Sequence, residues 1–257
     1  MPHEQPTVTL SDGYAMPLVG FGTWRLRGRQ AYEATRRALE VGYRHLDTAT
    51  LYGNEADVGR AVRDSGVPRD EVFIVTKLRP SDAGMERRVL AASLRDLDCG
   101  YLDLWLIHSP PAERAGLSTW REFLAAREEG LVRSVGVSNY DPDQLDLLAQ
   151  QTGQMPAVNQ IPWSPKQYDP DVLAGHRQRR VVLEGYSPLK NTRLDDPVLT
   201  AVADRHGVTT AQVVLRWHLA HEIPVIPKSA DPQRIASNLD LFGFALSDDE
   251  VARIDAL

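Results

Sequence analysis

Residues 45–55 read HLDTATLYGNE and place a carboxylate close to a phenol. Asp47 stands where a buried strand is expected to end, and Tyr52 follows in the turn beyond it. Aspartate is almost never fully buried unless its charge is paired. The sequence therefore predicts a partner for Asp47, and a purpose for that pairing.

Two further strand ends carry side chains that can complete a proton-transfer site. Lys77 and His108 each close an apolar run. Lys77 can pair with Asp47, and its ammonium can lower the pKa of a neighbouring phenol from the usual value of about 10. Such a phenol can donate a proton to a developing alkoxide near neutral pH, while an imidazole hydrogen-bonds the same oxygen. We therefore expect one catalytic group, made of Asp47, Tyr52, Lys77 and His108.

Each of these residues also has a purely structural explanation. Asp47 can cap a loop, Lys77 can be a surface cation, His108 can be a satisfied core histidine, and Tyr52 can be loop packing. Four different functional groups at or beyond three neighbouring strand ends favour catalysis. The sequence contains neither metal-ligand spacing nor a G-x-S-x-G or Ser-His-Asp signature, which argues against metal and nucleophile chemistry.

Lysine is scarce in this chain and gathers at predicted strand ends. Of 29 basic residues only four are lysines, and these are Lys77, Lys166, Lys190 and Lys228. All four come just past an expected strand end, whereas the expected helices use arginine. A compact ammonium with a tunable pKa is therefore expected on the functional face.

The elements that must position these residues alternate along the chain. Short apolar runs predict strands buried on both faces; they are LVGFG (18–22), YRHLD (43–47), VFIVTK (72–77), LDLWLIH (102–108), VRSVGVSN (132–139), PAVNQ (156–160), VVLEGY (181–186) and IPVIPK (223–228). Helical patterns lie between them, in eight units of roughly thirty residues. This predicts a single α/β domain over residues 1–257, a (β/α)8 TIM barrel. TVTLSDGYAMPL predicts an N-terminal β-hairpin that closes the bottom of the barrel.

An open doubly wound sheet is the alternative fold. That fold usually carries G-x-G-x-x-G between a strand and a helix. GFGTWR lacks the third glycine and is not followed at once by a helix. The sequence therefore favours the barrel.

The helices carry recognisable start and stop signals. In residues 30–42 one apolar stripe ends at Gly42, and in residues 141–153 an Asp-Pro opening ends at Gly153. Asp-Pro recurs at 196 and 231, and SDDE at 247 predicts a capping box.

Composition limits the functional class. The chain has 257 residues, 42% hydrophobic and 25% charged, with a net charge of −6. An acidic chain gives no reason to expect nucleic acid or an anionic membrane as a partner. The single cysteine, Cys99, is expected to pack in the core, and no apolar run has the length of a signal peptide or a membrane span. We expect a cytoplasmic monomer.

The motifs in their order resemble the aldo-keto reductase family over the whole chain. They are GFGTW, GYRHLDTATLYGNE, FIVTKL, YLDLWLIH, VGVSN, VNQI, GYSPL and IPKSADPQRIASN. Within that family the short loops resemble bacterial diketogluconate and carbonyl reductases. The resemblance implies an NADPH-dependent reductase of a small-molecule carbonyl substrate, with Asp47, Tyr52, Lys77 and His108 as its catalytic tetrad and no metal.

The resemblance also implies a set of cofactor-binding residues. Ser138, Asn139 and Gln160 would hold the nicotinamide carboxamide, and Tyr186 would stack on the ring. Ser187, Pro188 and Leu189 would line the pyrophosphate, with Lys190 beside them. Lys228, Ser229 and Arg234 would take the 2′-phosphate, and Asn238 the adenine. Gly22, Thr23, Trp24, Asp47 and Ile226 complete the set.

The 2′-phosphate assignment has its own physical reason. Two cations, Lys228 and Arg234, flank the start of a helix with Asp231 as its N-cap, and free N–H groups there would attract a phosphate.

Departures from the family pattern lie around the substrate. Trp24, Tyr52, Arg79 and His108 are the expected substrate residues. Arg79 and Ser109 stand where relatives often carry tryptophan, the segment after His108 is short, and the last expected helix ends at Leu257. We expect a wide pocket with broad carbonyl acceptance and weak binding, in which Arg79 favours anionic substrates.

The sequence admits three functions: a carbonyl reductase, a cofactor-binding regulatory subunit in which turnover is incidental, and a structural protein or metal-free hydrolase. The intact tetrad argues against the second, and the cofactor motifs argue against the third.

Overall fold

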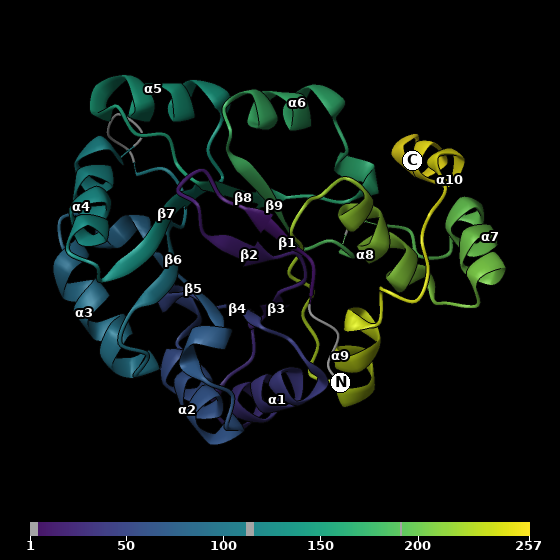
Figure 1. Ribbon diagram of the computed structural model, residues 1–257, viewed down its shortest axis with the longest axis horizontal. Helices are drawn as coiled ribbons and strands as arrows, with labels where there is room; N and C mark the ends of the chain where they lie inside the picture. Colours follow the sequence, from purple (N-terminus) through teal and green to yellow (C-terminus); the bar gives the residue numbers. More distant parts are fainter. Residues whose placement is uncertain (1–4, 112–115, 191) are drawn as a thin grey trace.

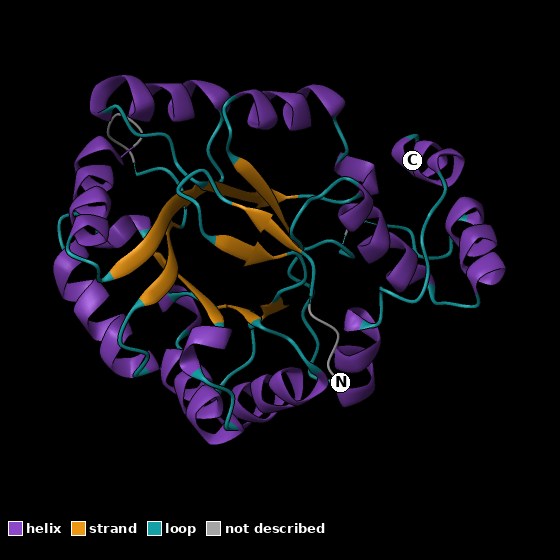
Figure 2. Cartoon of the chain, in the orientation of Figure 1, coloured by secondary structure: helices purple, strands orange, loops and turns teal. Residues whose placement is uncertain are grey.

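The computed structural model describes residues 5–111, 116–190 and 192–257. Seven strands form one curved parallel sheet in sequence order. They are β3 (Phe21–Gly22), β4 (His45–Asp47), β5 (Phe73–Leu78), β6 (Leu102–Ile107), β7 (Val132–Ser138), β8 (Val158–Pro162) and β9 (Val182–Tyr186). In Figures 1 and 2 the strands lie at the centre and the helices around them.

The helices follow the strands as the pattern predicts. They are α1 (Gly28–Val41), α2 (Glu55–Ser65), α3 (Glu86–Leu97), α4 (Leu117–Glu128), α5 (Pro142–Thr152), α6 (Pro170–Gln178), α7 (Pro197–His206), α8 (Thr210–Ala220), α9 (Pro232–Leu239) and α10 (Asp248–Asp255). No helix among these described residues is both long and apolar enough to cross a membrane.

The expected eighth strand, IPVIPK, is not continuous. Val225 forms isolated bridges with Val19 on one side and with Gly185 of β9 on the other. Pro224 and Pro227 flank this bridge, and proline has no N–H to donate to a ladder. Their carbonyls still accept backbone hydrogen bonds from the neighbouring strands. The (β/α)8 barrel is therefore confirmed, although isolated bridges close one side of its ring.

The N-terminal hairpin pairs β1 (Thr7–Thr9) with β2 (Ala15–Pro17) in antiparallel register. Leu10 and Met16 of the hairpin are buried against a cluster of barrel residues, which contains Phe73, Val75, Leu104, Leu106, Ala157 and Val158. Phe73 begins β5, so the hairpin covers the amino ends of the strands. The carboxyl ends of the strands, at the opposite end of the barrel, are not covered by the hairpin.

The helix signals are borne out by the caps. The buried stripe of α1 is the predicted one, and a left-handed Gly42 ends the helix. Asp141 and Ser247 each form a capping box at the start of α5 and α10. Cys99 is buried, as expected for a packing residue. The two capping boxes fix where α5 and α10 begin.

Candidate active site

A cavity of about 580 Å³ lies at the carboxyl ends of the strands. This is the end of a (β/α)8 barrel at which catalytic residues gather. The residues that line it are Gly22, Trp24, Arg25, Asp47, Leu51, Tyr52, His108, Ser138, Asn139, Gln160, Tyr186, Ser187, Pro188, Leu189, Lys190, Ile226, Pro227 and Lys228. Most of the residues expected around the nicotinamide and pyrophosphate are therefore brought together.

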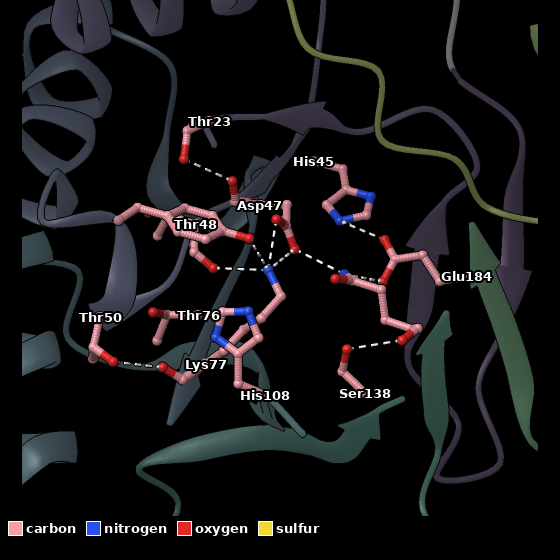
Figure 3. Close-up of polar contacts among 12 residues, drawn as sticks. Thr23, His45, Asp47, Thr48, Thr50, Thr76, Lys77, His108, Ser138 and Glu184 are labelled. Carbon is pink, nitrogen blue, oxygen red and sulfur yellow. Dashed lines mark hydrogen bonds and ion pairs between the residues drawn. The ribbon is translucent and has the colours of Figure 1, made fainter. Parts of the chain in front are cut away.

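Asp47 and Lys77 form the expected ion pair in the barrel interior (Figure 3). Lys77 Nζ donates to both carboxylate oxygens of Asp47 at 2.6 Å and to the Thr48 carbonyl at 3.0 Å. Burial lowers the pKa of Lys77, but the charge and hydrogen bond of Asp47, together with Tyr52 and Glu184, outweigh it, and the pKa is raised. Lys77 therefore stays protonated, and its charge compensates the buried carboxylate of Asp47.

Tyr52 ends a short 3₁₀ helix, η1 (Thr50–Tyr52), and its hydroxyl lies 3.4 Å from Lys77 Nζ. The expected net lowering of its pKa is not found. Burial raises the pKa of Tyr52 by more than the Lys77 charge lowers it, and the charge of Asp47 raises it further. The phenol is thus protonated at neutral pH, as a proton donor must be.

His108 follows β6 and lies beside Tyr52, with the two ring centroids 5.8 Å apart in an edge-on arrangement. Burial and, after it, the charge of Lys77 lower its pKa to about 4. The imidazole is therefore neutral at pH 7 and has a single N–H to donate. A neutral donor can hydrogen-bond a carbonyl oxygen without competing with Tyr52 as the acid.

The three polar residues expected around a carboxamide are tied to one another. The Ser138 hydroxyl donates to the Gln160 carbonyl at 2.8 Å. Asn139 Nδ2 donates to the His108 carbonyl at 3.0 Å, and Asn139 Oδ1 accepts from the Tyr186 hydroxyl at 2.9 Å. Asn139 also has a left-handed backbone, with φ of 63°. These contacts hold the amides and the aromatic ring in fixed positions at the cavity wall.

The residues predicted for the phosphate and the adenine lie only partly in the cavity lining. Lys190 and Lys228 line the cavity, whereas Ser229, Arg234 and Asn238 lie at or on α9. The expectation of free N–H groups at this helix start is wrong. Asp231 accepts hydrogen bonds from the backbone of Gln233 and Arg234, both at 2.9 Å. An anion there depends on side-chain cations instead.

Two expected cavity residues point elsewhere. Arg79 donates to both carboxylate oxygens of Asp82, at 2.8 and 3.1 Å, and is absent from the cavity lining. The Thr23 hydroxyl is buried and donates to the Asp47 carbonyl at 2.9 Å, so it supports Asp47 from behind.

Two residues were missed by sequence reasoning. Arg25 lines the cavity beside Trp24, with φ of 66°. Glu184 is fully buried in β9, within hydrogen-bond reach of the Asp47 network. The signal for Arg25 was a cation next to a predicted pocket tryptophan, and the signal for Glu184 was a carboxylate inside an apolar strand.

Comparison with known proteins agrees with this geometry. Residues 18–257 match the Aldo/keto reductase family. An aldo-keto reductase of Mycolicibacterium smegmatis is 44% identical over 98% of this chain and 93% of that protein. Methylglyoxal reductase DkgA of Salmonella typhimurium strain LT2 is 40% identical over 98% and 94%. An aldo-keto reductase of Bombyx mori, solved in complex with NADP, superimposes with a TM-score of 0.92 at 33% identity over 98% and 92%.

The chain therefore belongs to the aldo-keto reductase family of oxidoreductases. The family acts by reduction of carbonyl groups, in agreement with the first of the three functions compared above. Among the described residues there is no group of three or more His, Cys, Asp or Glu side chains that could hold a metal ion.

Proposed function

We propose that this protein reduces small aldehydes and ketones to alcohols with NADPH, and that Tyr52 is the proton donor. The observation that carries the proposal is the buried line Asp47–Lys77–Tyr52 at the floor of the cavity. When bound, the cofactor supplies a hydride to the carbonyl carbon. The protonated Tyr52 hydroxyl gives its proton to the carbonyl oxygen.

The neighbours of Tyr52 support this step. Proton donation leaves a phenolate, and the Lys77 ammonium at 3.4 Å stabilises that negative charge. Asp47 keeps Lys77 charged and fixes its position. The neutral His108 orients the substrate oxygen. None of these roles requires a group from outside the chain, so we also propose that the monomer is active.

The cavity fits a nicotinamide nucleotide. Its lining offers hydroxyl and amide groups for a carboxamide (Ser138, Asn139, Gln160), an aromatic platform (Tyr186), and two lysines (Lys190, Lys228). We assign the 2′-phosphate to Lys228, Ser229 and Arg234 and the adenine to Asn238. NADP in the Bombyx mori structure supports the same cofactor here.

The substrate class is small carbonyl compounds, with α-dicarbonyls as the first candidates. The name methylglyoxal reductase of the Salmonella typhimurium relative supports this choice. The proposal is tested with NADPH and a panel of aromatic aldehydes, α-dicarbonyls, keto acids and sugars. We expect NADPH oxidation with several classes and the highest kcat/KM for α-dicarbonyls. NADPH binding without oxidation by any of them would instead favour a cofactor-binding regulatory protein.

Arg234→Ala is expected to weaken NADPH binding at least about tenfold, since charge-assisted hydrogen bonds contribute roughly 1.5–3 kcal/mol each. NADH lacks the 2′-phosphate, so its affinity is expected to stay within about twofold. The measurement is the Kd of both cofactors by fluorescence titration. Arg253→Ala on α10 is the matched control and is expected to change neither value. Equal losses for NADPH and NADH would mean that Arg234 does not read the phosphate.

Arg79→Ala is expected to change kcat/KM by less than about twofold, for neutral and for carboxylated substrates alike. The reason is that Arg79 is held by Asp82 outside the cavity lining. Arg25→Ala is the informative comparison, because Arg25 lines the cavity. A loss confined to carboxylated substrates in the Arg79 variant would restore the original assignment of Arg79 to the substrate.

A further inference from the structure

Glu184 lies in the barrel interior with no exposed surface (Figure 3). It is on β9, directly opposite Gln160 of β8 in the strand register. Lysines and carboxylates are almost never fully buried without partners, because an unpaired buried charge is costly. The partners of its two carboxyl oxygens therefore indicate what Glu184 does.

One oxygen of Glu184 fixes the amide of Gln160. Gln160 Nε2 donates to Glu184 Oε2 at 2.8 Å and to Asp47 Oδ2 at 2.9 Å. A primary amide nitrogen has two hydrogens, so both are used inside the barrel. The amide oxygen is the polar atom that Gln160 then has left for a ligand in the cavity that it lines. With two acceptors on its nitrogen, the amide is held in one of its two orientations.

The other oxygen of Glu184 faces His45. His45 Nδ1 lies 3.1 Å from the Pro17 carbonyl, which can only accept, so Nδ1 carries a hydrogen. Nε2 of a neutral ring is then an acceptor, and it lies 3.5 Å from Glu184 Oε1. Among the described residues neither of these two atoms has another hydrogen-bond partner. Two acceptors face each other, and one proton between them would turn the contact into a hydrogen bond.

The neighbouring charges also favour one proton between Glu184 and His45. The charged groups that face it are Asp47 on β4 and Lys77 on β5. With Glu184 ionised, two carboxylates would share one ammonium in the dry interior. A proton on Glu184 leaves the Asp47–Lys77 pair balanced.

We propose that Glu184 and His45 are a buried positioning pair that holds one proton, carried by Glu184, and that orients the Gln160 amide toward the nicotinamide. Neither residue lines the cavity, so the pair acts through Gln160. The part that concerns the nicotinamide rests on the proposed function, whereas the protonation of Glu184 does not.

The pKa values of the two groups indicate that Glu184 carries the proton. Burial and the charge of Asp47 raise the pKa of Glu184 to about 8. Burial lowers the pKa of His45 to about 4. At pH 7 the folded protein therefore holds a neutral carboxylic acid next to a neutral imidazole.

Glu184→Gln is the test variant, because a glutamine amide mimics the protonated acid in shape and charge. Its nitrogen can donate to His45 Nε2 and its oxygen can accept from Gln160. We expect Glu184→Gln to bind NADP+ within about twofold of wild type at pH 7. Glu184→Leu removes both hydrogen bonds and is expected to weaken NADP+ about three- to tenfold, the range of a lost neutral hydrogen bond.

The pH dependence distinguishes the proton from packing. A raised pKa in the folded state means that stability is lost as the pH rises from about 4.5 to about 8. His45 acts in the opposite sense, but only up to its ordinary pKa of about 6.5. Between pH 6.5 and 8.5 wild type should therefore lose thermal stability relative to Glu184→Gln. Glu86→Gln, a buried carboxyl on α3 away from the barrel interior, is the control and should follow wild type.

An infrared spectrum supplies a readout that needs no cofactor. Wild type at pH 7 should contain the carbonyl band of a protonated buried carboxylic acid, and Glu184→Gln should lack that band. Absence of the band from wild type, or equal losses of NADP+ affinity in the Gln and Leu variants, would overturn the protonated pair. Unchanged NADP+ affinity in a folded Glu184→Leu would overturn the positioning role. If wild type binds no NADP+, the proposed function fails, while the band and the stability profile still test the proton.

Discussion

Tyr52→Phe is expected to lower kcat for carbonyl reduction at least about 100-fold, the lower end for positioned proton transfer. The substitution keeps the ring, whose centroid lies 4.8 Å from that of Trp24, and removes only the hydroxyl. None of the cofactor contacts that we propose involves that hydroxyl, so the Kd for NADP+ should stay within about twofold. The measurement is steady-state kcat together with a NADP+ titration of the same preparation.

Tyr14→Phe is the control for this experiment. Tyr14 is 42% exposed on the hairpin at the other end of the barrel, so loss of its hydroxyl should leave kcat unchanged. Near-normal turnover by the Tyr52 variant would show that another group donates the proton.

Lys77→Met should reduce both activity and stability. The side chains of Lys77 and Asp47 are 0% and 2% exposed, and loss of one partner leaves the other as a buried unpaired charge. Breaking a buried pair in this way costs roughly 3–5 kcal/mol. The free energy of unfolding from urea titration is expected to fall by about that amount, and kcat by at least about 100-fold, the same lower limit as for Tyr52.

A second substitution separates the two effects of Lys77. Asp47→Asn combined with Lys77→Met removes both charges and should recover a large part of the lost stability without restoring kcat. Lys77→Arg should also be impaired, because a planar guanidinium cannot replace a compact ammonium between Asp47 and Tyr52. A fully active arginine variant would contradict the role of Lys77 beside the phenol.

The pairing of Asp47 with Lys77 could be predicted because both residues stand at the ends of neighbouring strands. A buried Asp47 needs a cation nearby, and Lys77 stands at the end of the next strand of a parallel barrel. The helix boundaries were predictable because caps such as Asp141 and stops such as Gly42 act within a few residues.

The features that could not be predicted from the sequence depend on which neighbouring groups meet in the folded structure. Burial decides the pKa of Tyr52, because it outweighs the opposing charge of Lys77. Asp231 uses up the N–H groups of α9 that seemed open to a phosphate, and Arg79 turns to Asp82. Glu184 meets His45 only across the closed barrel, so that an apolar run with one carboxylate gave no hint of its partner. Each of these outcomes is a competition between neighbours, and spacing alone does not rank them.

We propose above all that this chain moves a hydride from a nicotinamide to a carbonyl carbon. The most direct measurement uses NADPH that carries deuterium at both hydrogen positions of nicotinamide C4 and an α-dicarbonyl substrate, with the product analysed by NMR and mass spectrometry. We expect deuterium on the carbinol carbon of the alcohol, in an amount that matches the NADPH consumed. Alcohol without deuterium on that carbon, or NADPH left unchanged after prolonged incubation with the enzyme, would contradict it.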